Sequence, residues 1–102
     1  MVKRVYILTN QLPDSEKYGL RSQVNRASVS IPSNIAEGCG RCSDKDLQRF
    51  LSISLGSAFE LETQLLLMME LYHIPETDNA LAEVKEVQRM ISGYSKYLSV
   101  KT

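Results

Sequence analysis

Two cysteines stand three residues apart in the segment Cys39-Gly40-Arg41-Cys42. This spacing is typical of a redox dithiol or of half a zinc site, since both need two thiolates within reach of each other. A redox dithiol accompanies a βαβ pattern, which is absent here, and a zinc site needs four ligands, whereas His73 is the only histidine. We therefore interpret Cys39 and Cys42 as ordinary thiols in a turn, and we expect no metal and no cofactor.

Other residue types that perform catalysis are sparse. His73 is expected at the end of a long helix, where a lone histidine is more often a C-terminal helix residue than a catalytic base. Without it, no nucleophile that depends on a histidine has a base. Gly38 and Gly40 lack the following Lys-Ser/Thr of a phosphate loop, so we interpret them as ending a helix. The sequence predicts that the protein is not an enzyme.

The position of one acidic residue in the sequence indicates a structural role. Glu62 falls near an apolar helical register, and a buried carboxylate needs a cationic or hydrogen-bonding partner. Arg26 and Asn34, on the preceding helix, are the candidates. We hypothesise a salt bridge between Arg26 and Glu62; the alternative is a solvated Glu62 at the edge of the apolar stripe.

Basic side chains recur at helical spacing in two rows. The first row repeats every four residues and consists of Arg41, Lys45 and Arg49. The second shares one face of a later helix and consists of Lys85, Arg89 and Lys96. With Arg21, these are candidates for contact with the phosphates of RNA or DNA. The alternative is a solvated face whose basic groups pair with neighbouring acids, in a chain whose 12 basic and 12 acidic residues cancel.

Length and composition indicate one folded domain over 1–102, since the chain has 102 residues of which 43% are hydrophobic. The apolar run near the N-terminus is too short for a signal peptide, and the run at 65–69 is too short for a membrane span. We expect a protein of the reducing cytoplasm, without a membrane partner.

Apolar residues recur every three or four positions, without the alternation of a strand. This pattern predicts an all-α chain with helices at about 2–12, 15–37, 44–72 and 78–98. Ser15, Ser43 and Thr77 are the expected N-caps, and Pro32 is expected to kink the second helix. Because the connections are short, consecutive helices should run antiparallel, as an up-and-down four-helix bundle.

The helix expected at 44–72 is apolar on more than one side. Four of its residues fall off the main apolar stripe: Ile53, Leu55, Phe59 and Leu66. A helix that is apolar on two sides must be buried on two sides. We therefore predict that this helix is covered on more than one side.

Two segments carry a distinctive pattern, YGLRSQVNRA at 18–27 and SIPSNIAEG at 30–38. Arg41, Phe50-Leu51, Gly56-Ser57 and the segment 60–62 continue this pattern in order. Over about 12–98 the chain resembles the four-helix bundle proteins encoded in intervening sequences of bacterial 23S ribosomal RNA genes. The resemblance implies structural roles for a set of signature residues: Arg26, Pro32, Asn34, Glu37, Gly38 and Glu62.

The resemblance implies a bundle that assembles as a ring, most often a homopentamer, and no established enzymatic activity. It also implies kinship with the accessory protein of diversity-generating retroelements, which binds nucleic acid and a reverse transcriptase. Those accessory proteins are strongly basic, whereas this chain is neutral. Family members also carry about one to two further helical turns before the residue that matches Val2.

Two hypotheses about function follow. The leading one is a non-enzymatic oligomeric scaffold for interactions. The alternative is an RNA- or DNA-binding accessory protein that uses the basic faces of the assembled ring, with a reverse transcriptase as a further partner.

Overall fold

The four predicted helices are present. The computed structural model describes residues 1–101 and contains α1 (Val2–Thr9), α2 (Leu20–Cys39), α3 (Asp44–Tyr72) and α4 (Thr77–Lys101). A 3₁₀ turn, Asp14–Glu16, lies between α1 and α2, and the described residues include no strand. The fold is all-α, as the periodicity predicted.

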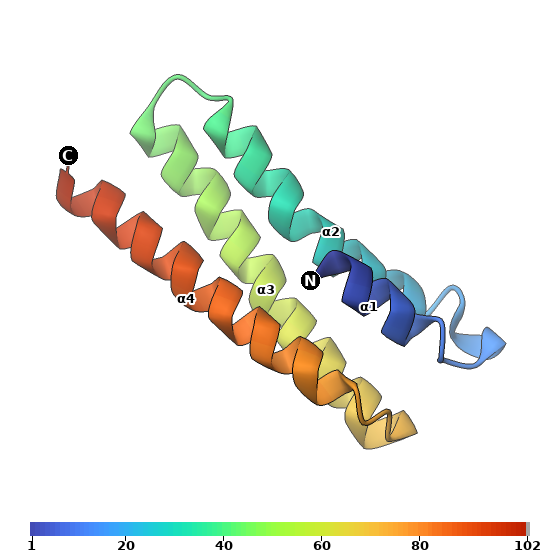
Figure 1. Cartoon of the computed structure of the whole chain (residues 1–102). Coiled ribbons are helices and arrows are strands. Elements are labelled where there is room, and N and C mark those ends of the chain that lie inside the picture. Colours follow the sequence, from blue (N-terminus) through green and yellow to red (C-terminus); the bar gives the residue numbers. More distant parts are fainter. Residues whose placement is uncertain (102) are drawn as a thin grey trace.

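The helices run alternately up and down in an elongated molecule of 47 × 22 × 17 Å (Figure 1). α3 packs against both α2 and α4, whereas α1 packs on α2 and, over a smaller area, on α4. α1 has 8 residues and α2 has 20, so α1 runs along only part of α2. This difference in length leaves one side of the bundle partly uncovered.

The core contains apolar side chains from every helix, at the three- and four-residue spacing read from the sequence. Burying one Leu, Ile or Val side chain stabilises the fold by about 1.5–3 kcal/mol, so these rows determine how the helices pack. The buried set includes Val5 and Leu8 of α1, Val24, Ala27 and Ile31 of α2, Ala58, Leu61 and Leu65 of α3, and Ala80, Val84 and Ile91 of α4.

Local hydrogen bonds define the helix ends. At the start of α3 the hydroxyl of Ser43 accepts from the Asp46 amide at 3.1 Å, so the predicted N-cap is confirmed and both bounds of α3 agree with the prediction. The N-cap predicted at Ser15 is wrong. α2 begins only at Leu20, because Asp14–Glu16 forms its own turn and the Glu16 carboxylate accepts from the Leu20 amide at 3.1 Å.

The remaining ends differ by a few residues from the prediction. α1 ends at Thr9 rather than Leu12, because the amides of Gln11 and Leu12 turn back to carbonyls three residues earlier, ahead of Pro13. α4 extends three residues further than expected and begins at Thr77. The buried Thr77 hydroxyl has no hydrogen-bond partner within residues 1–101, so it does not act as the predicted cap.

Pro32 lies inside α2, which continues as an α-helix on both sides of it. Polar contacts surround this position: Asn34 Nδ2 donates to the Ser30 carbonyl at 2.8 Å, and Ser54 Oγ of α3 donates to the Ile31 carbonyl at 2.8 Å. The hydroxyls of Ser30 and Ser57 lie 2.8 Å apart. The two serine contacts join α2 to α3 beside the proline, whereas the Asn34 bond lies within α2. The kink expected at Pro32 stays a prediction.

Within residues 1–101, no helix combines the length and the apolar character that crossing a membrane requires.

Candidate functional site

The residues that suggested chemistry lie at opposite ends of α3. Cys39 and Cys42 are free and exposed before α3, but only Cys42 lies in the predicted turn, because Cys39 is the last residue of α2. His73 is the exposed residue that caps the other end of α3. α3 has 29 residues and is therefore about 43 Å long at about 1.5 Å per residue. The fold does not bring the thiols and the imidazole together, and the described residues contain no group of three His, Cys, Asp or Glu suited to hold a metal.

Arg21, a predicted phosphate contact, has a structural role instead. Its Nε donates to the Thr9 carbonyl at 3.0 Å and its Nη2 donates to the Leu12 carbonyl at 2.7 Å. These carbonyls belong to the C-terminal end of α1 and the turn after it, where the helix leaves acceptors unpaired. The half-buried guanidinium thus fastens α1 to α2, and its contact with phosphate stays a prediction.

Two members of the first basic row do converge. The guanidinium carbons of Arg41 and Arg49 lie 5.0 and 4.8 Å from the centroid of the Phe50 ring. Arg41 also pairs with Glu37 at 2.7 Å, and Lys45 is exposed one turn before Arg49. The turn between α2 and α3 therefore carries a cluster of three cations, one of which is partly neutralised.

The second basic row lies exposed along α4, as the spacing predicted. Arg89 forms an ion pair with Glu86, a neighbouring acid of the kind that the solvated-face alternative expects. Glu83 pairs instead with Arg4 and, at 3.5 Å, with the Met1 ammonium group, both at the start of α1. Among the described residues no ion pair involves Lys85 or Lys96.

The hypothesised salt bridge between Arg26 and Glu62 is not formed. Arg26 is exposed, and the Glu62 carboxylate accepts from Gln88 Nε2 at 2.8 Å. Gln88 lies on α4, so Glu62 is turned toward α4 and away from α2. The reason is the rotation of α3 about its axis: Leu61 is fully buried in the core, and the next residue, Glu62, is turned to the α4 side.

The other signature residues hold α2 and its turn in place. Glu37 binds Arg41, and Asn34 binds the backbone of Ser30. Gly38 is buried where α2 meets α3, and a Cβ added there would lie 2.8 Å from the Cβ of Phe50. Asn34, Glu37 and Gly38 thus make local contacts in α2 and at its end, while their roles as signature residues of the family stay a prediction.

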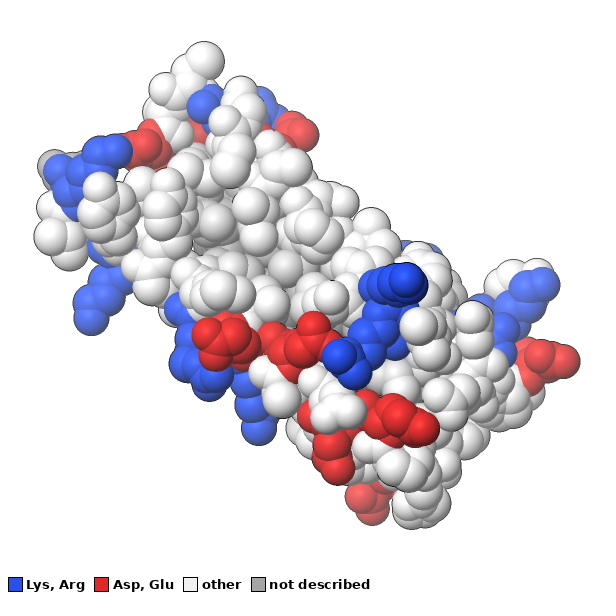
Figure 2. All heavy atoms as spheres, in the orientation of Figure 1, with Lys and Arg blue, Asp and Glu red and all other residues white. Residues whose placement is uncertain are grey.

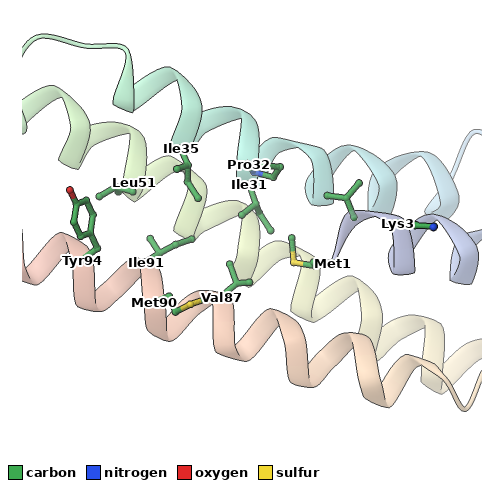
Figure 3. A pocket seen from close by; sticks show the side chains of 11 residues that line it. Met1, Lys3, Ile31, Pro32, Ile35, Leu51, Val87, Met90, Ile91 and Tyr94 are labelled. Atoms are coloured by element: carbon green, nitrogen blue, oxygen red, sulfur yellow. The ribbon is translucent and has the colours of Figure 1, made fainter.

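The structure adds a site that the sequence reasoning did not identify. An open groove of about 640 Å³ lies between α2 and α4, beside the first residue of α1 (Figure 3). Figure 2 shows this face of the molecule as a wide area without charged side chains. Its lining is almost wholly apolar and comes from all four helices: Met1, Val2, Ile31, Pro32, Ile35, Leu51, Val87, Met90, Ile91 and Tyr94, with Lys3 at the edge.

The signal that could have revealed the groove is helix length. A first helix of about ten residues cannot cover helices two to three times as long. Ile35, Met90 and Tyr94 lie where α1 does not reach, although their helical positions continue the apolar side of α2 and α4.

Comparison with known protein families gives one result that covers nearly the whole chain. The model of the family described as 23S rRNA-intervening sequence protein matches residues 1–93. No curated protein matches the chain. Since the matched region includes α1, α2, α3 and most of α4, the chain belongs to the 23S rRNA-intervening sequence protein family.

Proposed function

We propose that this protein is a non-enzymatic subunit that assembles with copies of itself and serves as a scaffold for interactions. The observation that carries the proposal is the outer surface of α3. Five large apolar side chains on this helix are about half exposed: Ile53, Phe59, Leu66, Leu67 and Leu71. Large exposed apolar side chains that gather on one helix mark interaction sites in soluble proteins.

The exposed residues of α3 form two rows rather than one. The α4-side row consists of Leu55, Phe59 and Leu66, at the four-three-four spacing that also contains Glu62. The opposite row consists of Ile53, Leu67 and Leu71. Exposed Ser52, Gly56, Thr63 and Glu70 separate the two rows.

Two different apolar rows on one helix suit a closed ring. In a ring, each subunit presents one surface to the copy on one side and a different surface to the copy on the other side. The α4-side row and the opposite row provide two such surfaces. The family resemblance supplies the expected number of subunits, five.

Sedimentation or light scattering of the purified chain at micromolar concentration tests the assembly. We expect a single oligomer for the wild type, and monomers for Phe59→Lys in the α4-side row and for Leu67→Lys in the opposite row. An equimolar mixture of the two variants should give dimers, because one intact surface remains on each. Tyr18→Lys, at a side chain that is 87% exposed and outside α3, is the matched control.

A monomeric wild type would contradict the proposal. Dimers of each variant alone would contradict the ring, because they would show that each row contacts its own equivalent in a second copy.

The cluster at the α2–α3 turn supports a second candidate function, RNA or DNA binding. Arg41 and Arg49 both lie against Phe50, with Lys45 nearby, and a ring would repeat this cluster in every subunit. Lys85, Arg89 and Lys96 would extend the basic surface along α4. The family resemblance adds a reverse transcriptase as a protein partner for this candidate function. The free thiols of Cys39 and Cys42 favour a location in the reducing cytoplasm.

Fluorescence anisotropy with a labelled RNA and a labelled DNA duplex, at low and at physiological salt, tests this candidate. Affinity should fall steeply with salt, and Arg49→Gln should reduce the slope of log K against log salt by about one, because each phosphate contact releases counterions. Arg26→Gln, at an exposed arginine outside the cluster, should leave the slope unchanged. Binding that does not depend on salt would exclude contact through phosphates.

A further inference from the structure

Two cysteines flank the residues at which the chain leaves α2 and turns toward α3 (Figure 1). Cys39 is the last residue of α2, Gly40 and Arg41 follow it, and Cys42 comes next. Both cysteines are free and exposed. Cysteine is among the residue types that are most often buried, so an exposed pair in a folded domain calls for a reason. Unlike a thiol in the core, both are open to reagents in solution.

The backbone between the two cysteines forms a tight turn. The amide of Arg41 donates to the carbonyl of Gly38 at 3.1 Å, and Gly40 has φ −81° and ψ −5°, so the chain stays in a helical turn just after Cys39. Residues three apart in a helical turn have Cβ atoms about 5–6 Å apart, and a disulfide needs about 3.5–4.5 Å. Gly40 can supply the adjustment of about 1–2 Å, because glycine has the least restricted backbone.

Two thiols at this spacing have two common uses, as a dithiol–disulfide pair and as part of a metal site. A metal site of the zinc type needs further ligands, and residues 1–101 hold no group of three His, Cys, Asp or Glu suited to a metal. A dithiol–disulfide pair needs only the two cysteines. In a reducing compartment such a disulfide is transient and acts in redox sensing, not as a permanent structural bond.

Arg41 is the residue on which a disulfide at this turn would act. Its guanidinium pairs with Glu37 at 2.7 Å and lies 5.0 Å from the centroid of the Phe50 ring. Because Arg41 lies between the two cysteines in the sequence, a disulfide would enclose its backbone in a small ring. The ring would restrain the dihedral angles on both sides of Arg41, and with them the position of its side chain.

We propose that Cys39 and Cys42 form a reversible disulfide by exchange with a low-molecular-weight disulfide, of which glutathione disulfide is the probe. One cysteine, as the thiolate, attacks glutathione disulfide, which gives a mixed disulfide and releases one glutathione. The other cysteine attacks the protein sulfur of the mixed disulfide, which forms the Cys39–Cys42 bond and releases the second glutathione.

The exchange balances without a further reactant. The two protein thiols are oxidised, one glutathione disulfide is reduced, and the two released glutathiones take up the two protons. Excess reduced glutathione drives the same steps backward and reopens the bond. The inference does not depend on the proposed ring or on the binding of RNA or DNA.

The test uses the full chain, equilibrated without oxygen in mixtures of reduced and oxidised glutathione and then alkylated at its free thiols. Mass spectrometry should show two alkylated thiols in excess reduced glutathione. As the oxidised fraction rises, the chain should lose both alkyl groups together and become two hydrogen atoms lighter than the reduced chain, with no glutathione attached. Excess reduced glutathione should restore both thiols.

Cys39→Ser and Cys42→Ser are the matched controls. Each variant keeps one thiol, so under the same oxidising conditions it should carry one glutathione. Both positions are exposed, so each variant should keep the fold, which circular dichroism checks.

A second measurement locates the effect of the bond. Amide NMR shifts between the reduced and the oxidised chain should be largest at Gly40 and Arg41, reach Phe50, and be absent from the middle of α4. Four results would overturn the inference: wild type that carries two glutathiones, disulfides between two chains on a non-reducing gel, loss of the helical circular dichroism signal on oxidation, and an unchanged Arg41 amide.

Discussion

Gly38 shows how a single atom sets the distance between two helices. It is buried in α2, and a Cβ at this position would lie 2.8 Å from the Cβ of Phe50 and 2.9 Å from Cδ1 of Leu47. The Leu47 methyl group can move aside, but the Phe50 Cβ is fixed to the backbone of α3. The absence of a side chain at Gly38 therefore permits the close approach of α2 and α3.

Gly38→Ala should lower the free energy of unfolding by about 1–2 kcal/mol, since the steric cost exceeds the gain in helix propensity. Gly56→Ala is the matched control on α3, where an added Cβ meets no atom within 4 Å. It should raise stability by up to about 1 kcal/mol. Urea denaturation measures the change in the free energy of unfolding for both variants. Equal changes in the same direction would show that Gly38 is not a point of close contact between α2 and α3.

His73 ends α3 in the left-handed conformation, with φ 52° and ψ 49°. A side chain in this region is strained, whereas glycine adopts it readily. His73→Gly should stabilise the chain by about 0.5–1 kcal/mol after the larger entropy of the unfolded glycine is included. His73→Ala retains the Cβ, so it should not raise the stability that thermal denaturation measures.

Tyr72 and Glu16 form a bond that should depend on pH. The Tyr72 hydroxyl donates to Glu16 Oε2 at 2.5 Å. This bond, followed by the bond from the Leu20 amide, lowers the pKa of Glu16, and the same bond to Glu16 raises the pKa of Tyr72. The bond therefore contributes stability above the usual Glu pKa of 4.5 and below the usual Tyr pKa of 10.0.

Tyr72→Phe should lower the Tm most between these two values. The difference from wild type should shrink as pH falls through the lowered pKa of Glu16, and again as pH rises through the raised pKa of Tyr72. Tyr97→Phe, at an exposed tyrosine of α4, should show no comparable pH dependence. A constant difference for Tyr72→Phe across this range would contradict the role of the bond.

At the scale of the element, α1 is the most weakly held helix. It has 8 residues, too few for an isolated helix to be stable, so its packing and its end contacts must hold it. Arg21 supplies two of those contacts from α2, and the ion pair of Arg4 with Glu83 supplies another from α4. α1 is thus fastened at both ends by arginines.

Arg21→Met should lower stability by about 1–3 kcal/mol, because the Thr9 and Leu12 carbonyls lose a charged donor. Hydrogen exchange should become faster at the amides of Val5 and Leu8 before it changes in α3. Arg26→Met, on the same helix, should have little effect, because Arg26 is exposed and does not pair with Glu62. Similar effects of the two variants would refute the special role of Arg21.

At the scale of the whole molecule, the described residues leave apolar surface on the bundle that includes the two rows of α3 and the groove. An oligomer that buries the rows of α3 should link stability to concentration, because assembly stabilises only the folded state. The Tm should therefore rise with protein concentration over the micromolar range. Phe59→Lys should abolish this dependence, while Tyr18→Lys should retain it; a Tm that is independent of concentration in the wild type would argue against assembly.

Local interactions explain what could be predicted from the sequence. The start of α3 at Asp44, its Ser43 cap and its end at Tyr72 depend on residues within a few positions of one another. The core rows of α2, α3 and α4 follow from the period of the α-helix. For the same reason the sequence also indicated that α3 is apolar on more than one side.

The choice of side-chain partners between helices could not be predicted in the same way. The rotation of α3 about its own axis decides whether Glu62 faces Arg26 or Gln88, and in the structure it faces Gln88. The position of α1 places the carbonyls of Thr9 and Leu12 beside Arg21. Both expectations rested on residue type and spacing, which do not specify rotation.

The sequence by itself determined which reactive side chains the chain has, namely one histidine and two neighbouring cysteines. In the fold the histidine and the cysteines lie at opposite ends of α3 and do not meet. The periodic apolar residues also determine the four helices, and the short connections determine their alternating direction. The groove between α2 and α4, the close approach at Gly38 and the contacts of Arg21 arise only when the helices pack. Each depends on which residues from distant parts of the chain lie within a few ångströms, and the packing of the whole core sets those distances.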